Sequence, residues 1–140
     1  MIIMAIDLGE VRTGLAVCDK NEILASPLCT ITEKNLNKLS NKIIEKISET
    51  NSELIILGLP LNMNGSYGQS AHKIIKFKEI LSKKININII LWDERRTTVS
   101  AISYLNELDI RNKKRKSIID SLSASIILEN YLNFKHNNIN

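Results

Sequence analysis

The hydrophobic and polar positions of the chain change their period from one segment to the next. Short and nearly unbroken apolar runs, as in IIMAIDL (2–8) and ELIILGL (53–59), are typical of strands buried on both faces. Apolar residues three and four positions apart, as in NLNKLSNKIIEKISET (35–50), are typical of a helix that packs one face on a core. These patterns predict strands at 2–8, 13–18, within 22–31, at 53–59 and at 86–92, and helices at 35–50, 71–84, 99–108 and 117–132.

The predicted order, βββαβαβαα, indicates an α/β protein. Short connections between the first three strands favour an antiparallel meander, and Pro27 marks an edge or a bend in the third. Helices between the later strands imply a five-stranded mixed sheet with helices on both faces. Ser70 is a candidate cap for the second helix. Because we find no internal repeat and no linker, we expect one domain over 1–135 and a frayed tail over 136–140.

Composition narrows the class of protein without identifying a function. The 140 residues are 44% hydrophobic, which is typical of a globular protein, and no apolar run is long enough to cross a bilayer. The N-terminus lacks the basic region of a signal peptide, so we expect a cytoplasmic protein. Cys18 and Cys29 form neither a CxxC motif nor a cluster with histidine, which argues against zinc and favours reduced packing residues. The net charge of +4 is compatible with a polyanionic partner.

Three acidic residues lie at positions from which separate elements could bring them together. Asp7 ends the first strand, Glu94 follows the fifth, and Asp120 lies in the last helix. Neighbouring carboxylates repel one another unless protons or cations intervene, and hard ions such as Mg²⁺ or Mn²⁺ prefer oxygen ligands. Such a set could hold two ions about 4 Å apart, an arrangement suited to in-line displacement at phosphorus. The alternatives are that Asp120 is a solvated helix residue and that Asp93, rather than Glu94, is the ligand.

Four stretches of the chain, taken together in their order and spacing, resemble the sequence motifs of a known protein family. They are AIDLGEVRTGLAVCD (5–19), ILGLPLNMNGSYGQSA (56–71), LWDERRTT (91–98) and KKRKSIIDSLSASIILENYL (113–132). In these stretches the sequence resembles the YqgF/RuvX family, the Holliday-junction-resolvase-like nucleases of pre-16S rRNA. The resemblance implies a ribonuclease-H-like fold. It also implies that Asp7, Glu94 and Asp120 are the catalytic residues and bind two Mg²⁺ or Mn²⁺ ions.

Residues in the loops beside the acids are candidates for contacts with nucleic acid. Gly9 either leaves room for a phosphate or only shapes a turn. Arg12 either clamps a phosphate in bidentate fashion or pairs with Glu10. Asn62, in the loop after the fourth strand, either contacts the substrate or is a turn residue.

Basic residues form a second group of candidates. Arg95 and Arg96 directly follow Glu94, and we expect one of them to reach the substrate while the other supports the acids. The run RNKKRK (111–116) precedes the helix of Asp120, so it could follow a nucleic-acid backbone toward the ions or be ordinary solvated surface. Its candidate substrate contacts are Lys113, Lys114, Arg115 and Lys116.

The expected function is that of a metal-dependent nuclease in 5′-end maturation of pre-16S rRNA. Nucleic acid is the expected partner, with no membrane, and we expect a monomer or a weak homodimer. A resolvase of branched DNA would use the same chemistry and stays open. A non-catalytic binding module is a third possibility, although it gains nothing from acids gathered near phosphate. An actin-like ATPase would need two related halves, which 140 residues with one DxG motif do not supply.

Overall fold

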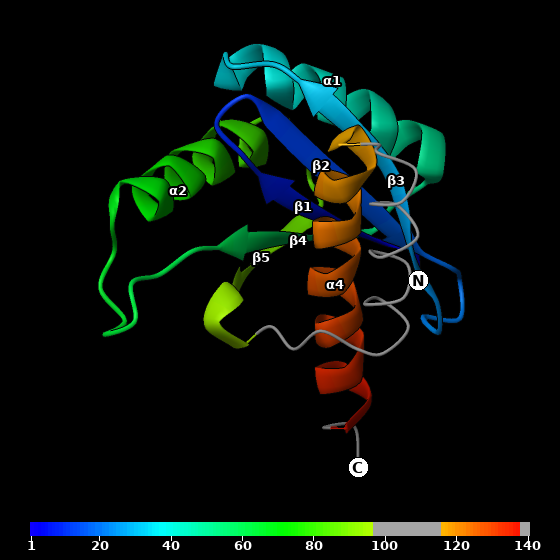
Figure 1. The fold of residues 1–140 in the computed structure, drawn as a ribbon. Coiled ribbons are helices and arrows are strands. Elements are labelled where there is room, and N and C mark those ends of the chain that lie inside the picture. The colour runs from blue at the N-terminus through cyan, green and yellow to red at the C-terminus, as the bar shows by residue number, and fades with distance from the viewer. Residues whose placement is uncertain (97–115, 138–140) are drawn as a thin grey trace.

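A five-stranded mixed sheet forms the centre of the described structure (Figure 1). This structure, a computed structural model, describes residues 1–96 and 116–137, with the side chains of the second segment described from residue 120 onward. The strands are β1 (Ile3–Leu8), β2 (Arg12–Cys18), β3 (Ala25–Thr32), β4 (Leu54–Leu59) and β5 (Asn88–Asp93). They lie in the order β3-β2-β1-β4-β5, with β1 to β3 antiparallel and β4 and β5 parallel to β1. The predicted meander and mixed sheet are confirmed.

Helices cover both faces of the sheet, as predicted. The helices are α1 (Leu36–Thr50), α2 (Gln69–Ser82) and α4 (Lys116–Asn137), and a short 3-10 turn, η1 (Glu94–Arg96), directly follows β5. Figure 1 shows α4 on one face and α1 and α2 on the other. In the central strand, Met4 and Ile6 pack in the core beneath α1 and α2, while Ile3 and Ala5 pack beneath α4. Burial on both sides explains why this strand reads as one apolar run.

The helix predicted over 35–50 is confirmed and has a cap at each end. The Asn35 side chain accepts a hydrogen bond from the backbone N–H of Lys38 at 2.9 Å. At the other end Asn51 adopts the left-handed conformation, with φ of 58°, which ends the helix. Its buried stripe consists of Leu39, Ser40, Ile43 and Ile47.

The starts of most predicted elements differ from the structure by one or two residues, and two positions need an explanation. Helix α2 begins at Gln69, and Gly68 occupies the N-cap without a side-chain hydrogen bond. The prediction that Ser70 caps this helix is therefore wrong, because Ser70 already lies in its first turn. The third strand, predicted within 22–31, begins at Ala25, because Glu22, with φ of 58°, belongs to the turn that enters the strand.

Helix α4 runs five residues beyond Leu132, where the sequence predicted its end. The extension has partners elsewhere in the fold, since the Phe134 ring packs on Trp92 and Lys135 pairs with Glu22. The predicted helix over 99–108 lies outside the described residues, as do residues 138–140.

The strand that carries Pro27 lies at an edge of the sheet, as the proline predicted. Pro27 pairs with Ala16 beside a β-bulge that interrupts the ladder between β2 and β3. Since proline has no N–H to donate, an edge position leaves no ladder hydrogen bond unmade on its outer side.

The cysteines behave as the sequence predicted, because both thiols are free. Cys18 is buried in the core beneath α4, and Cys29 is half-buried on β3. None of the described helices has the length and apolar character to cross a membrane.

An ion pair joins the turn before β3 to the last turns of α4. The Lys135 Nζ lies 2.6 Å from the Glu22 Oε1, and this contact holds the pKa of Glu22 below its ordinary value. A carboxyl group with a lowered pKa stabilises the fold above its unfolded pKa, and this contribution is lost as the pH falls through its folded pKa.

We therefore expect Glu22→Gln to lower the free energy of unfolding at pH 7 by up to about 1 kcal/mol. The difference from wild type should shrink between about pH 5 and about pH 3, measured by urea denaturation. Glu49→Gln is the control, because Glu49 pairs with Lys46 on an exposed helix surface. If Glu22→Gln lost as much stability at about pH 3 as at pH 7, the ion-pair explanation would be contradicted.

Candidate active site

Asp7, Glu94 and Asp120 come from three elements that meet at one edge of the sheet, on the face covered by α4. Asp7 lies near the end of β1, and Glu94 begins η1 directly after β5. Asp120 lies in α4, where its backbone carbonyl sits against Gly14, the β2 residue that pairs with Asp7. The fold thus brings together residues that are 87 and 26 positions apart in the chain (94 − 7 and 120 − 94).

The carboxyl groups of Asp7 and Glu94 are hydrogen-bonded to each other. Burial, then the charge of Asp7 and the hydrogen bond to it, raise the pKa of Glu94 to about 7. Burial also raises the pKa of Asp7, and the charge of Asp120 adds to that rise. The shifts are consistent with a protonated Glu94 that donates to an ionised Asp7. The proton on Glu94 is therefore held near neutral pH, and a cation bound between the two groups could replace it.

Asp120 lies near an arginine as well as near Asp7. The Arg12 Nε lies 3.2 Å from the Asp120 Oδ2, although the N–H is not aligned for a hydrogen bond. The sequence suggested phosphate or Glu10 as the partner of Arg12, and the structure shows a further partner, Asp120. The Arg12 side chain is 47% exposed, so it can pair with Asp120 and still present N–H groups to a ligand.

Gly9 forms a tight turn between β1 and β2. Its N–H donates to the Arg12 carbonyl at 3.0 Å, and a Cβ at this position would collide with that carbonyl oxygen. The turn-shaping role considered for Gly9 is therefore present in the structure.

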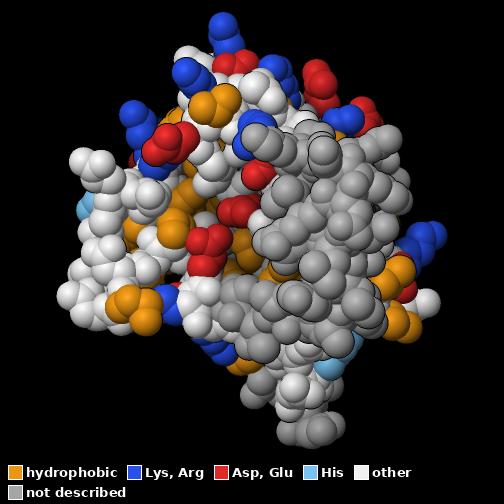
Figure 2. Space-filling view, in the orientation of Figure 1, with side chains coloured by type: hydrophobic (Ala, Val, Ile, Leu, Met, Phe, Trp, Pro, Cys, Tyr) orange, Lys and Arg blue, Asp and Glu red, His pale blue; other side chains and the backbone are white. Residues whose placement is uncertain are grey.

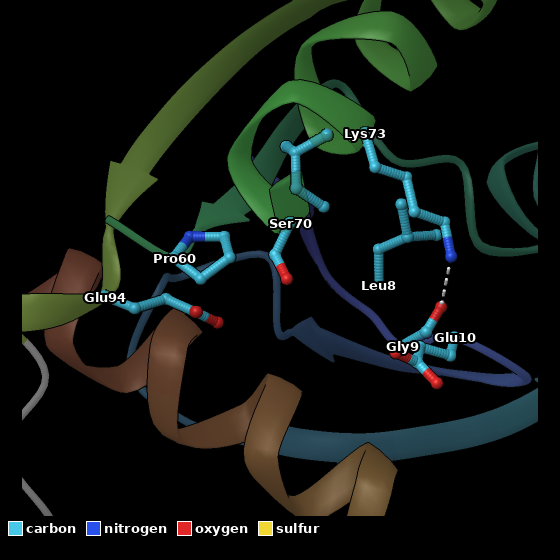
Figure 3. Close-up of a pocket in the computed structure, with 8 residues that line it drawn as sticks. Leu8, Gly9, Glu10, Pro60, Ser70, Lys73 and Glu94 are labelled. Atoms are coloured by element: carbon cyan, nitrogen blue, oxygen red, sulfur yellow. Dashed lines mark hydrogen bonds between the residues drawn. The ribbon is translucent and has the colours of Figure 1, made fainter. Parts of the chain in front are cut away.

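A pocket of about 200 Å³ adjoins Glu94 (Figure 3). The end of β1 and Pro60 form one side, and the first turns of α2 form the other with Ser70 and Lys73. The Lys73 Nζ donates to the Gly9 carbonyl at 3.1 Å, and Figure 3 shows it reaching down from α2 to that turn. Sequence reasoning missed Lys73, because α2 contains three lysines and nothing local distinguishes the one that faces the pocket.

In the space-filling view, acidic side chains gather in a hollow near the centre of this face, beside hydrophobic ones (Figure 2). Lysine and arginine side chains lie mainly above and around them. The hollow therefore offers carboxylate oxygens at its centre and positive charge at part of its rim.

Asp93, the alternative to Glu94 as a metal ligand, pairs with Arg95. The Arg95 guanidinium forms an ion pair with Asp93, with Nη2 2.7 Å from Oδ2 and Nε 3.1 Å from both carboxylate oxygens. This arginine lowers the pKa of Asp93 and also reaches the Met63 carbonyl at 3.4 Å. The structure thus places Glu94, and not Asp93, beside Asp7.

The Arg96 guanidinium packs against two aromatic rings. Its guanidinium carbon lies 4.5 Å from the centre of the Trp92 ring and 4.6 Å from that of Phe134. Trp92 is buried and also packs edge-on against Tyr131 of α4. Such cation–π contacts stabilise the junction between η1 and α4. Arg95 and Arg96 therefore each have a structural partner on different sides of Glu94.

Asn62 stabilises the loop between β4 and α2. Its side-chain amide donates to the Ser66 hydroxyl at 2.9 Å, and its backbone carbonyl accepts a hydrogen bond from the Gly65 N–H at 2.8 Å. The Asn64 side chain accepts from Ser66 in the same loop. The turn-residue alternative for Asn62 is therefore present in the structure. The basic residues 113–115 lie outside the described residues, and the side chain of Lys116 is not described.

The oxygen atoms at this edge of the sheet fit a hard divalent cation. In residues 1–96 and the described part of α4, no three Asp, Glu, His or Cys side chains already form a group that could hold a metal ion. Mg²⁺ does not need such a cage, because one or two carboxylates usually bind it while water and substrate phosphates complete its shell. Asp7 and Glu94 supply such a pair, and a cation would relieve the repulsion between them.

Comparison with solved structures identifies the fold. RuvC of T. thermophilus in complex with a Holliday junction substrate superposes with a TM-score of 0.65 at 11% identity, covering 99% of this chain and 96% of that one. The fowlpox virus resolvase bound to Holliday junction DNA gives a TM-score of 0.54 at 13% identity, over the full length of both chains. The ribonuclease-H-like fold expected from the sequence is confirmed.

Comparison of sequences identifies the family. A protein of Thermoanaerobacter pseudethanolicus named "Putative pre-16S rRNA nuclease" is 43% identical over 98% of this chain and 99% of its own length. A protein of the same name from Protochlamydia amoebophila is 44% identical over 93% of this chain and 91% of its own. The family model described as "RuvX: Holliday junction resolvase" matches residues 1–134. This chain therefore belongs to the RuvX family.

Proposed function

We propose that this protein is a cytoplasmic, divalent-metal-dependent nuclease that matures the 5′ end of precursor 16S rRNA, with one nuclease domain over residues 1–135. The observation that carries the proposal is the hydrogen-bonded pair of Asp7 and Glu94, with Asp120 beside it. Membership of the RuvX family supports a nuclease, and the names of the curated relatives support the rRNA substrate.

Each acid has a role that follows from its position. Asp7 lies on the central strand, with Glu94 on one side and Asp120 on the other, so it is the residue best placed to contact two Mg²⁺ or Mn²⁺ ions. Glu94 and Asp120 would complete the two sets of ligands. When bound, such ions activate water as the nucleophile and stabilise the leaving oxygen.

Arg12 would serve both the acids and the substrate. Its contact with Asp120 offsets part of the negative charge of the site before cations bind. Its exposed N–H groups can then donate to a phosphate oxygen, the acceptor that arginine binds best in bidentate fashion. The full set of proposed substrate contacts is Gly9, Arg12, Asn62, Arg95, Arg96, Lys113, Lys114, Arg115 and Lys116.

The buried acid pair argues against a non-catalytic binding module. A protein that only binds phosphates would be weakened by two carboxyl groups in its binding site, and the fold bears the free-energy cost of burying them. Raised pKa values at Asp7 and Glu94 show that this cost is present here. Clustered carboxyl groups of this kind are typical of catalytic sites.

The experiment that tests this function compares two substrates in parallel. Purified protein is incubated with Mn²⁺ or Mg²⁺ and either a precursor 16S rRNA 5′ end or a four-way DNA junction, with EDTA in matched reactions. We expect metal-dependent cleavage of the RNA and an intact junction. Cleavage of the junction alone would favour the resolvase alternative, which the family name and the likeness to RuvC also suggest. Cleavage of neither would exclude both.

A second prediction concerns the basic run before α4. Changing Lys113, Lys114 and Lys116 together to glutamine should weaken RNA binding and reduce the slope of log affinity against log salt by about 2, since each phosphate contact on a single strand contributes about 0.7. Fluorescence anisotropy with labelled RNA at several salt concentrations measures both quantities.

The control for this variant makes the same change of charge on α1, which lies on the face of the sheet opposite α4. It replaces Lys38, Lys42 and Lys46 of α1 with glutamine, and we expect the salt slope to stay near that of wild type. Equal slopes for the two triple variants would show that the basic run is ordinary solvated surface.

A further inference from the structure

Gly58 is the one residue of β4 without a large apolar side chain. The strand reads LIILGL, all six positions are buried, and the other five are leucine or isoleucine. A glycine in the interior of a strand weakens it and often marks a place where another group comes close to the backbone. Among the described residues, Gly65 is the glycine with positive φ, so the conformation of Gly58 does not itself require glycine.

The position of Gly58 lies between two of the proposed catalytic residues. Leu57 pairs with Ile6 on β1, so Gly58 is the neighbour of Asp7 in the next row of the sheet. On its other side Gly58 pairs with Trp92 of β5, the strand that leads into Glu94. Because neighbouring strands lie about 4.8 Å apart, β1 and β5 are separated by about 10 Å with β4 between them. The Glu94 side chain must therefore cross β4 to reach Asp7.

The space above Gly58 contains the Glu94 carboxyl group. A Cβ built on Gly58 would lie 2.8 Å from the Glu94 Oε1 and 3.3 Å from its Cδ. It would also lie 2.9 Å from the Cδ1 of Ile127, a buried residue of α4. The carboxyl group is thus held between the bare backbone of β4 and the helix above it.

We propose that Gly58 is a positioning residue, because its missing side chain opens the path by which the Glu94 carboxyl group crosses β4 to meet Asp7. This inference rests on the proposed function in one respect, namely that the two acids act together on bound cations. Any side chain at position 58 would compete with Glu94 for the same volume, and α4 prevents the glutamate from passing above it.

The test is Gly58→Ala, measured first with Mn²⁺ alone by isothermal titration calorimetry. We expect its affinity for Mn²⁺ to fall by about 10- to 100-fold, as when a group that orients a metal ligand is altered. Cleavage of the RNA under saturating Mn²⁺ should fall by a similar factor. A crystal structure of the variant should show the Glu94 carboxyl group displaced from Asp7.

Two further variants separate this role from helix packing. Ile127→Val removes the methyl group that a new Cβ would strike, so in the Gly58→Ala protein it should restore thermal stability without restoring Mn²⁺ affinity or cleavage. Ile56→Val changes a core residue on the same face of β4, two positions before Gly58, so it should lower stability while leaving Mn²⁺ affinity as in wild type.

Three results would overturn the inference. They are unchanged Mn²⁺ affinity in Gly58→Ala, recovery of that affinity on adding Ile127→Val, or a variant structure in which Glu94 still contacts Asp7. If wild type cleaves neither substrate, the proposed function fails, but Mn²⁺ affinity still tests the role of Gly58. If wild type binds no Mn²⁺, the position of Glu94 in the variant structure decides.

Discussion

Replacing Asp7 with asparagine is expected to abolish cleavage while the protein stays folded. Asparagine keeps the shape and one oxygen of aspartate but removes the charge that attracts a cation between Glu94 and Asp120. Altering groups that only support metal ligands lowers activity by about 10- to 100-fold, so loss of a central ligand should exceed about 100-fold. Single-turnover cleavage of precursor rRNA in Mn²⁺ measures the effect.

The same substitution should not lower stability, and this separates it from unfolding. Burial raises the pKa of Asp7, so its ionised form destabilises the folded protein increasingly as the pH rises through that pKa. Asparagine removes this penalty, so in metal-free urea denaturation the variant should gain stability relative to wild type as the pH rises above the ordinary pKa of aspartate, about 4.

Asp19→Asn is the matched control for this variant. The Asp19 Oδ1 accepts hydrogen bonds from the backbone N–H groups of Ile23 and Leu24, which an asparagine oxygen can also accept, and the turn lies away from the acids. We expect full activity. Wild-type cleavage by Asp7→Asn would show that the three acids are not the catalytic centre.

Replacing Gly14 with alanine is expected to cause the largest loss of stability. A Cβ on Gly14 would overlap the backbone carbonyl of Asp120 and lie 2.8 Å from the backbone N of Ser121. Backbone atoms of a packed helix cannot rotate away, so α4 would have to move off β2. Overpacking usually costs about 1–3 kcal/mol, and we expect about 3 kcal/mol or more here. That corresponds to a fall of about 10 °C in Tm.

Thermal unfolding and cleavage should both report this change, because moving α4 also displaces Asp120. Gly68→Ala is the comparison, since a Cβ there would lie 3.3 Å from the Asn62 side chain, which can adjust. Its loss should be limited to a weaker cap on α2, about 1 kcal/mol or less. Equal losses for the two alanine variants would refute the close packing of α4 on Gly14.

Much of the fold could be predicted because each element carries its own local pattern. The apolar run of β1 reflects burial on both faces, and the stripe of α1 reflects burial on one. The ends of helices and strands were harder to predict where contacts with residues distant in the sequence determine them. The extension of α4 depends on contacts of Phe134 and Lys135 with residues far away in the sequence, and no local pattern contains that information.

The candidate site was predictable in its acids but not in their partners. Asp7, Glu94 and Asp120 stood out by their positions in the predicted elements and by the family resemblance, and the fold gathers them at one edge of the sheet. The pairing of Arg12 with Asp120 depends on where α4 crosses β2, which the sequence alone does not reveal. Local spacing likewise could not show that Arg95 would pair with Asp93 and that Arg96 would pack on Trp92.

The packing of Trp92 gives the protein a built-in optical reporter. It is the single tryptophan of the chain, it is buried between β5 and α4, and it lies two residues before Glu94. Its emission therefore comes from one known place and depends on its contacts with Arg96 and the rings of α4. Intrinsic fluorescence can follow both separation of that helix from the sheet and changes beside the acids, without any label.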